Sequence, residues 1–496
     1  MRRIAKVVVA LLALAAIGLG GWRLHAAREG VVETSLAVGE IPARVFRPAS
    51  GAAGPVLVVA HGFAGSQQMM QAFAVTLARN GYVAVTFDFP GHGRNPVPLA
   101  GGLSDDRAAA GALMAALGRV VEAAGRLGDG RLALLGHSMA ADIVMRWAVP
   151  RPEVAAMVAL SGFGPEVTAD RPRNLLLLVG AWEPGFLQEA ARKVVGPATE
   201  ERVTYGRFDD GTGRRYALAA GVEHIGILYS RDALAESLAW LDGVFGRLGD
   251  GFLDIRGGAL ALLFGGLLAL GWPLSALLPR AVAREEGGGM GWRRFWVVAL
   301  VPAVATPLLL RLVPGRFLPL LLGDYLALHC ALYGVLTGLL MWWRGAGWSR
   351  ARPGRVALGA IGVAAYAMLG FGVAIDLLLT SFLPVGMRAW LVPAMLCGTL
   401  PWFLADEWAV RGPHAARLAA PATKLAFLVS LLLAVALDPR RLFFLVIIVP
   451  VMLFFLTVYG LVGRWSWRAT GTPLPAAIGH ALALAWALAA TFPLVE

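Results

Sequence analysis

Three residues with the side chains needed for nucleophilic acyl chemistry occur in the order serine, acid, histidine: Ser138, Glu183 and His224. Ser138 lies in Gly136-His137-Ser138-Met139-Ala140, directly after the apolar run Leu132–Leu135 and before an alanine-rich stretch. A sharp turn from a strand to a helix needs small residues around its serine, and it lifts the hydroxyl clear of the sheet. The usual last glycine of such a turn is replaced here by alanine, the next smallest residue. We therefore predict that Ser138 is the nucleophile.

His224 is the candidate general base. It lies in the turn Gly221–Gly226, before the amphipathic stretch Arg231–Phe245, which we expect to be the last helix of its domain. A histidine at this place in the chain follows both the serine and the acid, which is the order found in serine hydrolases with a central parallel sheet.

The acid should follow the next-to-last predicted strand, Leu175–Val179. The turn there contains Glu183, which we predict orients His224 and stabilises its imidazolium. Glu166, after the run Val154–Leu160, is the alternative, and Asp209 or Asp210 are more distant ones.

Two backbone amides are candidates for an oxyanion hole. Phe63 lies in the turn His61-Gly62-Phe63-Ala64-Gly65 after the run Val56–Ala60, and Met139 directly follows the candidate nucleophile. Two N–H groups aimed at one oxygen stabilise the anion that forms when a nucleophile attacks a carbonyl. A further Gly/Pro-rich turn, Asp88–Arg94, is interpreted as structural, a wall of the site.

These turns need a scaffold of alternating strands and helices. Short apolar runs predict strands, and longer amphipathic stretches between them predict helices. The predicted strands are Val56–Ala60, Tyr82–Phe89, Leu132–Leu135, Val154–Leu160 and Leu175–Val179, and the predicted helices include Gln67–Arg79 and Asp105–Arg126. Such alternation predicts an α/β fold with a mostly parallel sheet, whose reactive groups gather at the carboxyl ends of the strands.

Residues 55–245 resemble the α/β-hydrolase superfamily, near its monoacylglycerol-lipase and serine-aminopeptidase-like members. The resemblance rests on four turns in the expected order: His61-Gly62-Phe63, Asp88-Phe89-Pro90-Gly91-His92-Gly93, Gly136-His137-Ser138-Met139 and Glu223-His224. It implies attack by Ser138 on an acyl carbonyl, an acyl-enzyme, and its hydrolysis by water that His224 activates. It does not specify the substrate.

Composition divides the 496 residues into three parts. We expect a signal-anchor helix in residues 1–29, the α/β-hydrolase domain in 30–250, and an all-α transmembrane domain in 251–496. Overall, 58% of the residues are hydrophobic and only 15% are charged. The net charge of +12 does not predict nucleic-acid binding, because many arginines adjoin apolar segments. Neither of the two cysteines, Cys330 and Cys397, lies in the hydrolase part, and no cluster predicts a metal or nucleotide cofactor.

Apolar segments of about 20 residues predict membrane spans. Besides the uncleaved N-terminal anchor, about eight are expected, near 257–279, 295–313, 317–343, 357–383, 389–405, 419–437, 443–463 and 474–493. With the N-terminus inside, arginines concentrate in the inner loops, as the positive-inside bias requires. This orientation places the hydrolase domain on the extracytoplasmic side of the cell membrane.

Several polar residues fall inside these predicted spans: Asp324, His329, Asp376, Asp406, Glu407 and His480. Our main interpretation is hydrogen bonding between helices. Asp406-Glu407-Trp408-Ala409-Val410-Arg411 also resembles the Glu-Glu-x-x-x-Arg motif of CPBP-type intramembrane proteases. That family's Phe-x-x-x-His motif is absent, and Leu484 stands where its asparagine would follow His480. A degenerate relative that serves as a scaffold fits better than a second protease.

The residues favour a membrane-bound serine hydrolase of the esterase or lipase type, acting on lipid-like or small acyl esters. An acyltransferase would use the same three side chains, with an alcohol or amine in place of water. A peptidase, and a transporter with a ligand-binding hydrolase-like domain, remain alternatives. The oligomeric state is not predicted.

Overall fold

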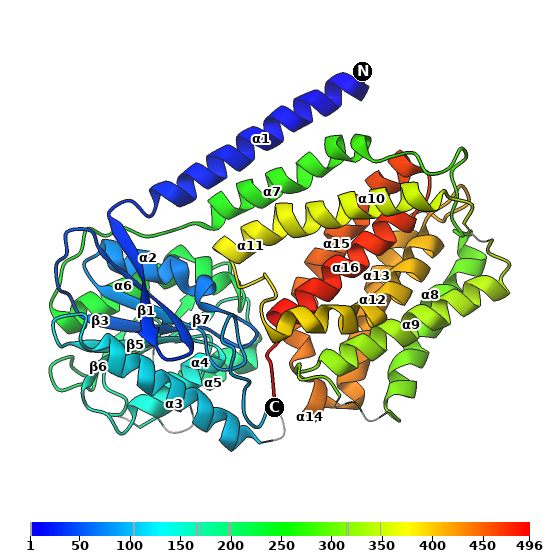
Figure 1. The fold of residues 1–496 in the computed structure, drawn as a ribbon. Coiled ribbons are helices and arrows are strands. Elements are labelled where there is room, and N and C mark those ends of the chain that lie inside the picture. Colours follow the sequence, from blue (N-terminus) through cyan, green and yellow to red (C-terminus); the bar gives the residue numbers. More distant parts are fainter. Residues whose placement is uncertain are drawn as a thin grey trace. The chain divides into compact units, whose positions relative to one another are not determined.

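The part of the chain predicted to be a hydrolase domain is built on a mixed β-sheet, seen in a computed structural model of the whole chain (Figure 1). The structure describes residues 2–102, 105–164, 167–168, 170–196, 200–313, 315, 317–347 and 349–496. Within them, the sheet has nine strands in the order β1-β2-β4-β3-β5-β6-β7-β9-β8. The strands are β1 (Val31–Val38), β2 (Ile41–Pro48), β3 (Val56–Ala60), β4 (Val83–Phe87), β5 (Leu132–His137), β6 (Val154–Leu160), β7 (Leu175–Gly180), β8 (Thr204–Tyr205) and β9 (Arg214–Ala219).

The middle of the sheet is parallel and its edges are antiparallel. Pairings from β4 through β3, β5, β6 and β7 to β9 are parallel, whereas β1 with β2, β2 with β4, and β8 with β9 are antiparallel. Every residue of β3, β4, β5 and β7 is buried, which explains their unbroken apolar runs. The predicted α/β fold is therefore confirmed.

Helices cover both faces of this sheet (Figure 1). One apolar core joins it to α3 (Asp106–Ala124), α4 (Met139–Ala148) and α5 (Gly185–Val195). The other joins it to α2 (Gln71–Arg79) and α6 (Arg231–Phe245), with Phe73 and Trp240 fully buried. Short 3₁₀ helices η1 (Gln67–Met70) and η2 (Gly226–Tyr229) precede α2 and α6.

Some strand ends differ from those predicted. β5 continues to His137, which pairs with Leu160 of β6. β4 ends at Phe87 rather than Phe89, because the Phe89 amide donates to the imidazole of His61 instead of to a strand.

The chain forms two compact units. The hydrolase unit comprises Gly18–Leu263, Ile375–Ser381 and Pro493–Glu496, and the helical unit comprises Met1–Ile17, Phe264–Ala374 and Phe382–Phe492. Two short segments far along the chain thus belong with the sheet. Leu494 exchanges backbone hydrogen bonds with Gly91 and Leu99, and Leu99 also forms a bridge with Val495.

The remaining elements are nearly all helices. They are α1 (Arg2–Ala26), α7 (Gly257–Leu274), η3 (Ser275–Leu277), α8 (Trp292–Leu310), α9 (Gly323–Trp343), α10 (Pro353–Ala365), the π-helix η4 (Tyr366–Gly372), α11 (Val373–Leu378), α12 (Met387–Val410), α13 (Ala419–Leu437), α14 (Pro439–Leu442), α15 (Leu445–Thr470) and α16 (Leu474–Thr491). In the described part of the chain, nine helical segments are long and apolar enough to cross a membrane.

Close helix packing in the helical unit depends on glycine. A Cβ at Gly334 of α9 would lie 2.3 Å from the Trp402 amide nitrogen of α12. A Cβ at Gly398 of α12 would lie 2.4 Å from the Ala327 carbonyl oxygen of α9. Larger residues at these two positions would push the helices apart, so small residues allow the backbones to approach.

Candidate active site

Ser138 lies at the tip of the turn between β5 and α4. Its backbone has φ 55° and ψ −119°, a strained conformation for a residue with a side chain. Hydrogen bonds on both sides hold it there: its N–H donates to the Leu160 carbonyl, and its carbonyl accepts from the Ala141 amide. A Cβ at Gly136 would lie 2.5 Å from the Ala140 carbonyl oxygen, so the turn demands a small residue there.

His224 joins Ser138 to Glu183. The Ser138 Oγ lies 2.8 Å from His224 Nε2, and His224 Nδ1 lies 2.8 Å from Glu183 Oε2. An ionised carboxylate can only accept, so Nδ1 carries the proton and Nε2 accepts the serine hydroxyl. The structure thus brings together the three side chains predicted as nucleophile, base and acid.

The Glu183 carboxylate is buried and well supplied with donors. Besides His224, Ser161 Oγ donates to its Oε1 at 2.6 Å, and the Gly180 amide does so at 2.9 Å. Burial raises the pKa of Glu183, but the hydrogen bonds from His224, Ser161 and Gly180 outweigh it and leave this pKa below its usual value. The carboxylate is therefore ionised at neutral pH.

Ser161 and His137 were missed as supporting residues in the sequence analysis. Ser161 follows β6 directly, at the carboxyl end of the sheet, and this position was the available signal. His137 Nε2 donates to the His224 carbonyl at 2.8 Å. Burial, reinforced by the nearby His224, lowers the pKa of His137 to about 3, so its imidazole is neutral.

The alternative acids predicted from the sequence were Glu166, Asp209 and Asp210. Glu166 lies outside the described residues. Asp209 pairs with Arg207 and Asp210 accepts from Thr212, on an exposed loop.

The loop that carries Phe63 abuts the nucleophile turn. A Cβ at Gly62 would lie 3.0 Å from the Ser138 Cβ and 2.9 Å from His137 Nδ1, so only glycine allows this approach. The Gly65 amide closes the turn by donating to the Gly62 carbonyl. Met139 is the first residue of α4, whose N-terminus provides N–H groups and a partial positive charge.

The turn Asp88–Arg94 supports this loop. The buried Asp88 carboxylate accepts from the amides of Gln67 and Arg94 at 2.7 and 3.0 Å. His61 Nδ1 donates to the Gly62 carbonyl at 2.8 Å, and burial lowers the pKa of His61 although Asp88 lies nearby. These contacts agree with the structural interpretation of this turn.

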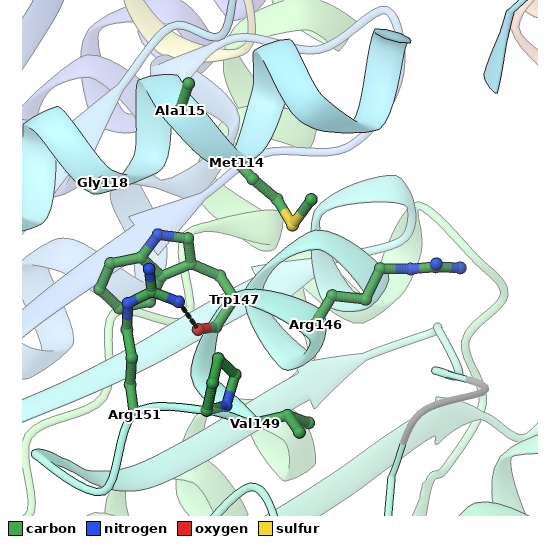
Figure 2. Close-up of a pocket in the computed structure, with 8 residues that line it drawn as sticks. Met114, Ala115, Gly118, Arg146, Trp147, Val149 and Arg151 are labelled. Carbon is green, nitrogen blue, oxygen red and sulfur yellow. Dashed lines mark hydrogen bonds between the residues drawn. The ribbon is translucent and has the colours of Figure 1, made fainter. Parts of the chain in front are cut away.

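A separate hollow of about 810 Å³ lies between α3 and α4 (Figure 2). Figure 2 shows Arg151 folded over the Trp147 ring, 4.0 Å from its centre, and donating to the Trp147 carbonyl at 2.6 Å. The residues of α4 that line the hollow lie near the carboxyl end of this helix, whereas Ser138 precedes its amino end. The hollow is therefore not part of the candidate site.

Comparison with known proteins agrees with this fold. Residues 51–190 match the family model described as serine aminopeptidase, S33. The chain contains a hydrolase-like α/β domain. A relative described as the uncharacterized protein Rv2307c of Mycobacterium tuberculosis (strain H37Rv) is 35% identical over 141 residues, 28% of this chain and 47% of that protein. The chain spans about half the length of the curated relatives it matches.

Solved structures similar to part of this chain include two that match over nearly their whole length. TT1662 from Thermus thermophilus is 19% identical and covers 44% of this chain and 99% of its own, with a TM-score of 0.35. A membrane phospholipase A, described as a novel bacterial virulence factor, is 18% identical and covers 49% of this chain and 99% of its own, with a TM-score of 0.33.

Polar residues predicted inside spans have partners of several kinds. Asp324 accepts from the Leu318 amide, and His329 bonds Tyr325 and Ser430. Asp376 belongs to the hydrolase unit.

The segment Asp406–Arg411 contains two buried carboxylates in ion pairs, and the comparisons give no support to its resemblance to CPBP proteases. Lys424 pairs with Asp406, and Arg411 pairs with Glu407 at 3.0 Å. His480 stacks on Tyr459 at 4.7 Å between ring centres. Asp406 is thus paired with α13, as expected for contacts between helices, whereas Glu407 is paired with the residue directly after its own helix.

Proposed function

We propose that this chain is a membrane-bound serine hydrolase that cleaves acyl esters through Ser138, His224 and Glu183. The observation that carries the proposal is the hydrogen-bonded series of these side chains, with both links at 2.8 Å. A serine becomes a strong nucleophile when an adjacent base can take its proton. The strained backbone at Ser138, which turns from β5 into α4, supports the same role.

The reaction has two halves. Ser138 Oγ attacks the acyl carbonyl while His224 Nε2 takes the hydroxyl proton, and the Phe63 and Met139 amides receive the oxyanion. Collapse of the intermediate breaks the ester bond, and His224 gives the proton to the departing alcohol. Water, deprotonated by His224, then attacks the acyl-enzyme and releases the acid and free Ser138. Glu183 stays ionised and stabilises the imidazolium in both halves.

The membrane attachment favours lipid-like esters, since the helices would keep the domain at a bilayer surface.

We further propose the division into an anchor (1–29), a hydrolase domain (30–250) and a transmembrane domain (251–496), with the hydrolase domain on the extracytoplasmic side of the cell membrane. The side of the membrane can be tested with Ser50→Cys, which places a cysteine at an exposed position of the predicted hydrolase domain. Cys397→Ser removes the exposed native cysteine from the same chain. We expect labelling by a membrane-impermeant maleimide in intact cells; labelling only after lysis would place the domain inside.

Labelling with a fluorophosphonate serine probe tests the chemistry. Detergent-solubilised protein should be labelled and should hydrolyse short- and long-chain acyl esters, and Ser138→Ala should lose both while keeping its thermal unfolding midpoint. Full activity in Ser138→Ala would refute the nucleophile assignment. Added alcohol that diverts the acyl group into a new ester would identify an acyltransferase.

A further inference from the structure

The segment Ser66–Gln71 directly follows the loop that carries Phe63, and it receives hydrogen bonds from distant parts of the chain. It forms η1 and the first residue of α2. The loop before it closely approaches the Ser138 turn at Gly62, and Phe63 is only three residues from Ser66. Ser66 is fully buried.

The first set of bonds comes from residues 375–381, at and beyond the end of the candidate span Pro353–Leu378. The Ser381 amide donates to Ser66 Oγ at 2.8 Å, and Thr380 Oγ1 lies 3.0 Å from the same oxygen. Ser66 Oγ also lies 2.8 Å from Gln68 Oε1, and Gln68 Nε2 donates to the Asp376 carbonyl at 3.2 Å. These bonds tie Ser66 and Gln68 to residues 376–381.

A second set converges on Gln71. Its Oε1 accepts from Arg28 at 2.7 Å and from Arg256 at 3.0 Å. Arg28 lies two residues after α1, and Arg256 lies one residue before α7. Both helices are candidate membrane spans, so residues next to three spans meet on this segment.

A third contact reaches the loop through the neighbouring turn. Asp376, with a buried side chain, forms an ion pair with Arg94 at 2.5 Å. The Arg94 amide donates to Asp88, whose carboxylate also holds the Gln67 amide. Asp376 of α11 therefore contacts both the segment after the Phe63 loop and the turn Asp88–Arg94.

We propose that Ser66 and Gln68 are positioning residues, through which the chain next to the candidate membrane spans holds the Phe63 amide in place for the oxyanion. This inference rests on the proposed function. Misplacing a catalytic group by about 1 Å can cost about 100-fold in rate. The catalytic rate of the hydrolase domain thus depends on residues 375–381, which sequence order assigns to the transmembrane region.

The full-length Ser66→Ala variant tests this. We expect kcat per active serine, counted by fluorophosphonate labelling carried to completion, to fall about 10- to 100-fold with KM unchanged, because an oxyanion donor acts on the transition state. Ser66→Thr keeps the hydroxyl and should restore most of the rate. Ser237→Ala is the matched control: Ser237 is also buried, but among the described residues its Oγ bonds only within α6, to the Ala233 carbonyl.

Gln68→Leu is the second variant, for the case in which Ser66→Ala fails to fold, because Gln68 is only half-buried. It should show the same loss of kcat. Wild-type kcat in both variants, or a raised KM with kcat unchanged, would overturn the inference while Ser138-dependent labelling left the proposed function intact. No labelling of the wild-type chain would refute both.

Discussion

The two units use buried charge in opposite ways. In the hydrolase unit, the Glu183 carboxylate faces the imidazole of His224, which would gain a proton during the proposed reaction. In the helical unit, Asp406 and Glu407 face the permanent cations Lys424 and Arg411. The His224 side chain is 23% exposed, whereas that of Lys424 is only 6% exposed. All three carboxylates are buried, but the basic partner of Glu183 is partly exposed, whereas the basic partner of Asp406 is buried.

The largest expected effect concerns Glu183. Glu183→Gln should lower kcat/KM about 1,000- to 10,000-fold, because an amide nitrogen facing Nδ1 favours the tautomer whose Nε2 cannot accept the serine proton. Ester hydrolysis at saturating and limiting substrate would measure it. Glu166→Gln is the comparison, and we expect it to be near wild type. The reverse ranking would make Glu166 the acid.

The buried ion pair between Asp406 and Lys424 should matter for stability instead. Lys424→Met would leave the buried Asp406 without its cation, at a cost of about 3–5 kcal/mol in the free energy of unfolding. The midpoint of thermal unfolding in detergent should therefore fall. Turnover per labelled serine should stay unchanged.

A double variant tests whether the Asp406–Lys424 pair serves stability or takes part in the reaction. Lys424→Met with Asp406→Leu removes both charges and should recover most of the lost stability, because no unpaired charge remains. Reduced turnover per labelled serine at normal stability would instead give the pair a part in the chemistry.

Sequence reasoning succeeded where local pattern and burial coincide. β3 and β6 have the predicted bounds, since strands buried on both faces are continuous apolar runs. The edge strands β1 and β2 went unpredicted because their polar and exposed residues mask them, and β9 begins with two arginines. The three turns carrying Ser138, Glu183 and His224 were found from their places after strands.

Hydrogen bonds between residues far apart in the chain could not be predicted from the sequence. Ile375–Ser381 looked like the end of an apolar span, and nothing local indicates that Ser381 bonds Ser66, more than 300 residues away. Ser161 is one serine among several, and its bond to Glu183 exists only because β6 and β7 are neighbours.

Acid should weaken the hydrolase unit through His137. Its pKa is about 3 when folded against 6.5 in the free side chain, so its contribution to stability is complete above pH 6.5 and is lost as the pH falls toward 3. Near pH 5 the loss amounts to about 2 kcal/mol. His61 acts in the same direction.

His137→Gln tests this acid sensitivity. The unfolding midpoint should fall less between about pH 7 and pH 5 in the variant than in the wild type, although some loss from His61 remains. An equal fall in both proteins would show that folding does not lower the pKa of His137.

The smallest predicted effect concerns Ser161, whose hydroxyl donates to the Glu183 carboxylate. Ser161→Ala should lower kcat/KM about tenfold, since a hydrogen bond to a charged group contributes about 1.5–3 kcal/mol. That bond favours the carboxylate, so its loss raises the pKa of Glu183 toward the usual value and moves the acid limb of the pH–rate profile to higher pH. Ser237→Ala, which removes a buried hydroxyl from α6, should leave that limb in place. An acid limb that stays fixed in Ser161→Ala would mean that the serine supports the loop rather than the charge of Glu183.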